Sequence, residues 1–187
     1  EGYALTGWRN LRKGEGDGSD CLKFAAILSV VMALVCIVQP ATPPKGGEGV
    51  PILKALSMMS NPTFAVFIIV SLVVAGMMQF YFLGTARFLQ DMGVSAKNVP
   101  GIMGIAQAAQ ALATLFLLGL FFSKLGPKWT LTIGALSWLL LYVAYTIRAP
   151  KGVLVASQVF HGLAYVMFMI AGQMYVNAVA PAEIVGS

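Results

Sequence analysis

Uncharged hydrogen-bonding side chains lie deep inside apolar stretches of this sequence. Placing such groups in a lipid bilayer is costly unless they bind a partner or a ligand. In chain order they are Gln79, Gln107, Gln110, Gln158, His161, Tyr165, Gln173 and Asn177. Residues three, four or seven apart share one face of an α-helix, so Gln107 and Gln110 form one polar stripe. Gln158, His161 and Tyr165 form another on the same rule. Amides and an imidazole beside aromatic rings suit a flat, neutral, polar molecule such as a nucleobase or a sugar.

Each of these residues also has a purely structural explanation. Gln79 or Gln110 alone can serve as a hydrogen-bonded link between two helices, and so can His161. The combination favours a ligand site, because three separate apolar stretches each carry such groups. Phe80, Tyr81 and Phe82 directly follow Gln79 and add aromatic surface. A site for an anion would instead need Arg or Lys deep in a stretch, and none lies there.

No arrangement typical of catalysis or metal binding occurs in the sequence. There is no phosphate-binding loop, no nucleophile motif and no metalloprotease motif. His161 has no carboxylate in any apolar stretch to orient it. Cys21 and Cys36 have no metal-ligand spacing and are expected to be small membrane residues. We therefore expect neither an enzyme nor a cofactor.

Five stretches without charge provide the elements that must position these side chains. They lie between Lys23 and Lys45, Lys54 and Arg87, Lys97 and Lys124, Lys128 and Arg148, and Lys151 and Glu183. A helix needs about 20 apolar residues to cross a bilayer, and all five stretches approach or exceed that length. The expected helices cover 22–39, 61–89, 100–122, 129–147 and 153–179, with a short amphipathic helix at 52–60. The sequence therefore predicts an all-α, polytopic transmembrane helix bundle.

Composition supports this fold class. The chain is 58% hydrophobic and 10% charged, whereas a soluble domain has about 25% charged residues. The net charge of +5 comes from cations scattered singly at segment ends, which favours contact with lipid headgroups and excludes nucleic-acid binding. Because residue 1 is not Met and the last residues read as a connecting loop, we expect a fragment of a longer protein.

The order of motifs resembles the nucleoside:proton symporter family of the major facilitator superfamily. The motifs are Met59-Ser-Asn-Pro-Thr-Phe after a Pro-rich stretch, Ala75-Gly-Met-Met-Gln, Ile102-Met-Gly-Ile-Ala-Gln-Ala-Ala-Gln110, Phe121-Phe-Ser-Lys-Leu-Gly-Pro-Lys128, His161-Gly-Leu-Ala-Tyr165 and Ala180-Pro-Ala-Glu183. The resemblance implies that 1–39 end the N-terminal half, 40–62 form the central linker, and 63–187 form a partial C-terminal half with four helices. It also implies an inner-membrane location.

The same resemblance implies a set of residues that contact a nucleoside-like substrate. The family positions are matched by Gln79, Gln107, His161 and Tyr165, and the expected set is completed by Phe82 and Gln110. Three positions depart from the family pattern: Phe82 replaces an Asn, Gln110 replaces a Glu and Val166 replaces an Asp. The two lost carboxylates are the groups expected to couple transport to protons. Only His161 could titrate within a span, so it is the candidate for proton coupling.

We interpret the chain as part of a permease for a nucleoside or a related small polar solute, working by alternating access, with or without proton coupling. The alternative is a non-transporting receptor or assembly factor on the same fold, in which the polar residues would link helices. The family orientation places 40–62 and 123–128 in the cytoplasm. The distribution of Lys and Arg would favour the opposite orientation.

Overall fold

The computed structural model describes residues 19–40 and 56–180, and the fold in this part of the chain is helical throughout. The elements are α2 (Ser19–Val38), η1 (Met58–Ser60), α4 (Pro62–Asp91), η2 (Ala96–Asn98), α5 (Val99–Leu112), η3 (Ala113–Leu118), α6 (Gly119–Thr146), α7 (Lys151–Ala164), η4 (Tyr165–Ile170) and α8 (Ala171–Val179). Segments η3 and η4 are single stretches of π-helix, which join α5 to α6 and α7 to α8.

Three helical stretches among the described residues are long and apolar enough to cross a membrane. They are Pro62–Asp91, Ala96–Thr146 and Lys151–Val179, and Leu22–Val38 is a shorter apolar helix. The second stretch covers two expected spans and is broken at Gly126, whose φ of 75° lies in the left-handed region. Pro127 follows directly and lacks the N–H that a continuous helix would need. The helices thus fit a transmembrane bundle, and the number of five spans stays a prediction.

Local signals in the sequence explain where α4 begins and ends. Asn61 caps its start, because its Oδ1 accepts a hydrogen bond from the backbone N–H of Thr63 at 2.9 Å. Gly93 ends it with a φ of 81°, and the N–H of Val94 donates to the carbonyl of Leu89. The Nζ of Lys151 donates to the carbonyl of Gly93 at 3.0 Å, which ties this turn to the start of α7. The expected surface helix at 52–60 lies partly outside the described residues.

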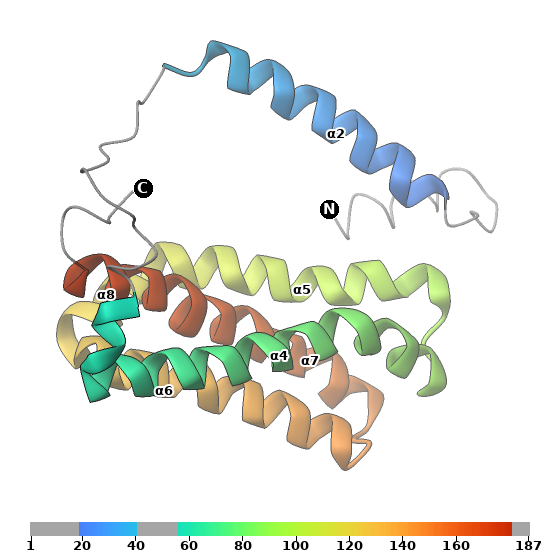
Figure 1. Ribbon diagram of the computed structural model, residues 1–187. Helices are drawn as coiled ribbons and strands as arrows, with labels where there is room; N and C mark the ends of the chain where they lie inside the picture. Colours follow the sequence, from blue (N-terminus) through green and yellow to red (C-terminus); the bar gives the residue numbers. More distant parts are fainter. Residues whose placement is uncertain (1–18, 41–55, 181–187) are drawn as a thin grey trace.

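The helices run in alternating directions, and α7 with η4 occupies the centre of the bundle. Figure 1 shows α5 and α6 on either side of α7, with α4 across the front. Two glycines allow this close packing. A Cβ on Gly162 of α7 would lie 2.2 Å from the carbonyl oxygen of Ala106 in α5, and one on Gly134 of α6 would lie 2.7 Å from the backbone nitrogen of Phe168 in η4. Helices in lipid associate through such small residues.

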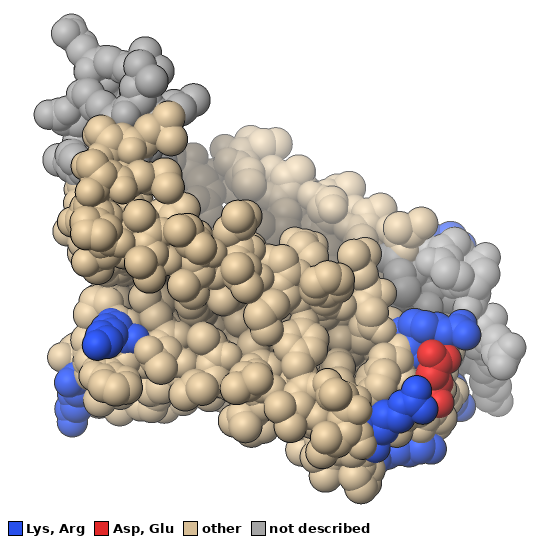
Figure 2. Space-filling view, turned by 60° about the horizontal axis from the view of Figure 1, so that its bottom comes forward, with Lys and Arg blue, Asp and Glu red and all other residues tan. Residues whose placement is uncertain are grey.

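The outer surface of the bundle is apolar, and its charges lie at the two ends. Figure 2 shows Lys and Arg at both ends of the face in view and an uncharged surface between them. Helix α2 is set apart from the bundle in Figure 1 and exposes apolar side chains such as Ile37. Such a surface is stable in contact with lipid or further apolar helices.

Replacing Gly162 by alanine is expected to separate α5 from α7. Its added methyl group would overlap backbone atoms of α5, which cannot move aside as a flexible side chain can. Overpacking of this kind costs about 1–3 kcal/mol, so thermal unfolding of the full-length protein in detergent should occur at a lower temperature. Gly152→Ala on the same helix is the matched control, because nothing lies within 4 Å of its Cβ position. Equal stability of the two variants would contradict this packing.

Candidate functional site

Six polar and aromatic side chains meet in the interior where α4, α6 and α7 adjoin. The group, called the tyrosine–histidine cluster below, consists of Tyr81, Trp138, Tyr142, Tyr145, Gln158 and His161. Four of its members, from all three helices, are at most 1% exposed, whereas Tyr142 and Tyr145 are half-buried. Such burial in a membrane protein is costly unless the polar atoms find hydrogen-bond partners.

Gln158 is the hydrogen-bonding centre of the cluster. Its Oε1 accepts from the hydroxyl of Tyr81 at 2.7 Å, and its Nε2 donates to the hydroxyl of Tyr145 at 2.8 Å. The same Nε2 also donates to the carbonyl of Leu154 at 3.1 Å. Both amide donors and the amide oxygen are therefore used, and one side chain of α7 links α4 to α6.

His161 lies one helical turn further along α7, enclosed by aromatic rings. It stacks on Tyr81 with ring centroids 3.5 Å apart and planes inclined by 11°. Its Nδ1 accepts a hydrogen bond from the indole Nε1–H of Trp138 at 3.2 Å. The ring of Phe82 stands nearly perpendicular to it, with centroids 5.7 Å apart. The imidazole is thus held on one face by Tyr81, at its edge by Phe82 and at one nitrogen by Trp138.

Tyr142 adds a second link between α4 and α6. Its hydroxyl donates to the backbone carbonyl of Met77. A carbonyl oxygen has two lone pairs, so it can accept this bond in addition to the one within its own helix. By contrast, Ser137 and Ser157 are satisfied by carbonyls of the preceding turn in their own helices. Only the larger polar side chains therefore link one helix to another here.

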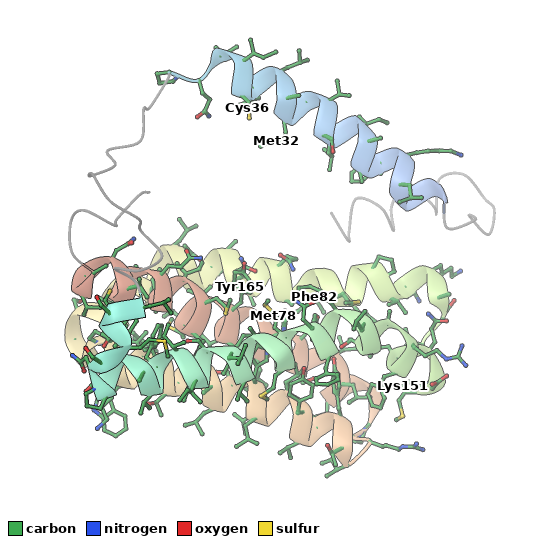
Figure 3. All side chains as sticks on the ribbon, viewed as in Figure 1. Met32, Cys36, Met78, Phe82, Lys151 and Tyr165 are labelled. Atoms are coloured by element: carbon green, nitrogen blue, oxygen red, sulfur yellow. The ribbon has the colours of Figure 1, made fainter. Side chains whose placement is uncertain are left out.

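The residues predicted from the sequence fall into two groups. His161 is buried within the cluster, and Phe82, which is 48% exposed, lies against its ring. Tyr165 is half-buried at the start of η4. Figure 3 places Phe82 and Tyr165, with Met78, between α4 and α5. His161 and Phe82 are therefore the predicted site residues that the structure shows in contact.

The predicted amides lie further out. Gln79 and Gln107 are exposed and Gln110 is half-buried. The backbone nitrogen of Gln110 lies close to Gly162, so this part of α5 faces α7. Gln173 and Asn177 lie elsewhere, in an open groove of about 500 Å³ between α4 and α8. The fold therefore does not gather all the polar residues into one pocket.

Sequence reasoning missed Trp138, Tyr142 and Tyr145 as partners of the polar residues. A signal for them was present, because positions 138, 142 and 145 are spaced by four and three and share one helix face. Gln158 was recognised as part of the stripe with His161, and the two do lie in one cluster. Tyr165, the third member of that stripe, makes no hydrogen bond with described residues.

Replacing Tyr81 by phenylalanine should destabilise the folded protein while leaving the ring stack in place. The change removes the donor to Gln158 and leaves a buried amide oxygen unpaired, which costs about 1–3 kcal/mol. Thermal unfolding of the full-length protein in detergent measures this loss. Tyr175→Phe is the matched control, because that hydroxyl has no hydrogen bond among the described residues while its ring contacts Phe67. A Tyr81→Phe variant as stable as this control would be evidence against a cooperative cluster.

Comparison with known proteins adds the family to this geometry. The family model described as nucleoside H+ symporter matches residues 18–187. No curated protein and no solved structure matches the chain. A symporter is a transporter, which is not a class of enzyme, and the apolar helices agree with a place in the membrane. Because the match covers most of the sequence, the chain belongs to the nucleoside H+ symporter family.

Proposed function

We propose that this chain supplies the central linker and most of the C-terminal half of a nucleoside:proton symporter of the major facilitator type. The observation that carries the proposal is the family match over residues 18–187, in a chain with three long apolar helices. In this proposal the break at Gly126 separates two spans, and α2 is a further one, which gives five. The two halves of the full protein rock around a midplane site, and the location is the plasma (inner) membrane.

The proposed nucleoside site lies on the side of the bundle where Figure 3 shows Phe82 and Tyr165 between α4 and α5. Phe82 offers a partly exposed aromatic face, and Tyr165 offers a ring and a hydroxyl. Bases stack on such rings, and each stacked pair adds about 0.5–1.5 kcal/mol beyond its buried area. Gln79, Gln107 and Gln110 complete the site. Their side-chain amides have no hydrogen-bond partner among the described residues, so they are free to bind a base edge or a ribose hydroxyl.

Proton coupling in this proposal depends on His161. Gln110 and Val166 occupy positions where the family resemblance implies carboxylates, and neither side chain can titrate. His161 is the one imidazole in the sequence, and its place beside Phe82 puts it next to the proposed substrate surface. Imidazole changes charge near neutral pH more readily than any other side chain.

Gln107→Ala in the full-length protein should weaken nucleoside binding without changing the fold. Gln107 is exposed, and losing one hydrogen bond to a neutral ligand costs about 0.5–1.5 kcal/mol, which is a rise in Kd of roughly twofold to somewhat more than tenfold. The measurement is thermal stability in detergent with and without a panel of nucleosides, nucleobases and sugars. A ligand at about 100 times its Kd stabilises the folded state by roughly 2.7 kcal/mol.

The matched control is Gln90→Ala, which removes an exposed amide near the end of α4. Both variants should unfold at the wild-type temperature without ligand, and only Gln107→Ala should show a reduced ligand shift. An unchanged shift would remove Gln107 from the site. The absence of a shift with every ligand at millimolar concentration would favour the alternative of a non-transporting receptor or assembly factor.

His161→Gln should uncouple nucleoside movement from proton movement. Glutamine keeps hydrogen-bonding capacity at this position but cannot carry a proton at neutral pH. In vesicles, wild-type protein should accumulate nucleoside when a proton gradient is applied, and the variant should only equilibrate it. Gradient-driven accumulation by His161→Gln at the wild-type level would show that the coupling proton binds elsewhere.

A further inference from the structure

The hydrogen bond between Trp138 and His161 defines where the imidazole carries its proton. The indole N–H of Trp138 is a donor only, and it points to Nδ1 of His161 at 3.2 Å. An Nδ1 that accepts this bond cannot itself hold a hydrogen. A neutral imidazole has one N–H, so the proton must be on Nε2. The structure thus selects one of two tautomers.

The surroundings leave the imidazole little freedom to escape this bond by rotation. His161 is 1% exposed and Trp138 is 0% exposed. Tyr81 covers one face of the imidazole at a centroid distance of 3.5 Å, and Phe82 stands against it nearly at a right angle. Turning the ring over would require these aromatic contacts to separate. Packing therefore fixes the orientation of the imidazole, and the hydrogen bond from Trp138 then selects its tautomer.

The groups that face His161 from each neighbouring helix carry no charge. From α4 the titratable neighbour is Tyr81, and from α6 the titratable members of the cluster are Tyr142 and Tyr145. At the adjoining Gly162, α5 presents Ala106, Ala109 and Gln110, which do not titrate. The described acidic and basic side chains lie near the ends of the bundle helices or in α2, as in the exposed pair of Arg87 with Asp91.

We propose that Trp138 is a positioning residue that holds His161 in the Nε2–H form and makes protonation of His161 compete with the contact between α6 and α7. A second proton can bind only to the lone pair of Nδ1, which the N–H of Trp138 now occupies. Two N–H groups cannot face each other, so proton uptake breaks this bond and releases the indole. This inference rests on the proposed proton coupling at His161.

The selected tautomer also limits what His161 can do for a substrate. With Nδ1 occupied, the remaining ring nitrogen is a donor, so it can bind only an acceptor such as a base carbonyl or a ribose oxygen. The same nitrogen stays a donor when His161 is protonated. Binding of the nucleoside therefore does not require His161 to change its hydrogen-bonding role. Proton uptake instead breaks the hydrogen bond from Trp138.

Nitrogen NMR of the full-length protein, labelled with ¹⁵N-histidine and held in lipid nanodiscs, tests this directly. The signals of His161 are identified by their loss in His161→Gln. In wild-type protein at neutral pH we expect a protonated Nε2 and an unprotonated Nδ1. In Trp138→Phe we expect a mixture of both tautomers. The midpoint for protonation should rise by about one pH unit, the equivalent of one lost hydrogen bond.

Two variants separate this role from general packing. Trp129→Phe makes the same change at an exposed position of α6 and should leave the signals unaltered. Tyr81→Phe disturbs the cluster at Gln158 but retains the stack and the Trp138 bond, so the tautomer should persist.

A protonated Nδ1 in the wild-type protein overturns the proposal, and this measurement does not need a folded Trp138 variant. A Trp138→Phe variant with the wild-type tautomer and midpoint overturns it as well. Because no nucleoside is added, a failure of the proposed nucleoside transport would not alter either result, and the two ideas can fail separately.

Discussion

A polar side chain inside a bilayer is costly unless it finds a hydrogen-bond partner within the protein, and this cost governs the tyrosine–histidine cluster. Gln158 satisfies it by using every polar atom of its amide, with two tyrosines and one backbone carbonyl as partners. His161 satisfies it at Nδ1 through Trp138. Each bond joins two helices or a helix to itself. The helices are therefore arranged so that their buried polar side chains reach hydrogen-bond partners.

The glycine contacts make this arrangement possible. Apolar side chains gain little by leaving lipid for another apolar surface, so helix association in a membrane depends on close fit. Gly162 lets α5 approach one side of α7, and Gly134 lets α6 approach η4. With α6 so close, its aromatic side chains at 138 and 145 reach the polar atoms of α7. A larger residue at Gly134 would move these side chains away from their hydrogen-bond partners on α7.

Much of the secondary structure could be predicted from the sequence, because its signals are local. Asn61-Pro62 and Gly126-Pro127 marked a helix start and a break, and the structure confirms both. The candidate site was harder to predict. The amide of Gln79 was predicted to contact a substrate, yet Gln79 is exposed. Tyr81, two positions later, is buried. These positions point to opposite sides of α4, and with apolar residues all round the helix no amphipathic pattern shows which side faces inward.

The cluster's lack of formal charge has an electrical consequence. A membrane potential exerts a force only on charge, about 2.3 kcal/mol per elementary charge for each 100 mV. Tyrosine, tryptophan and glutamine side chains that shift across the field therefore contribute no gating charge. Among the described side chains of the bundle interior, a protonated His161 would be the one carrier of positive charge. Among these described residues, a membrane potential would therefore act on the interior through a single proton, and an unprotonated interior offers it no formal charge.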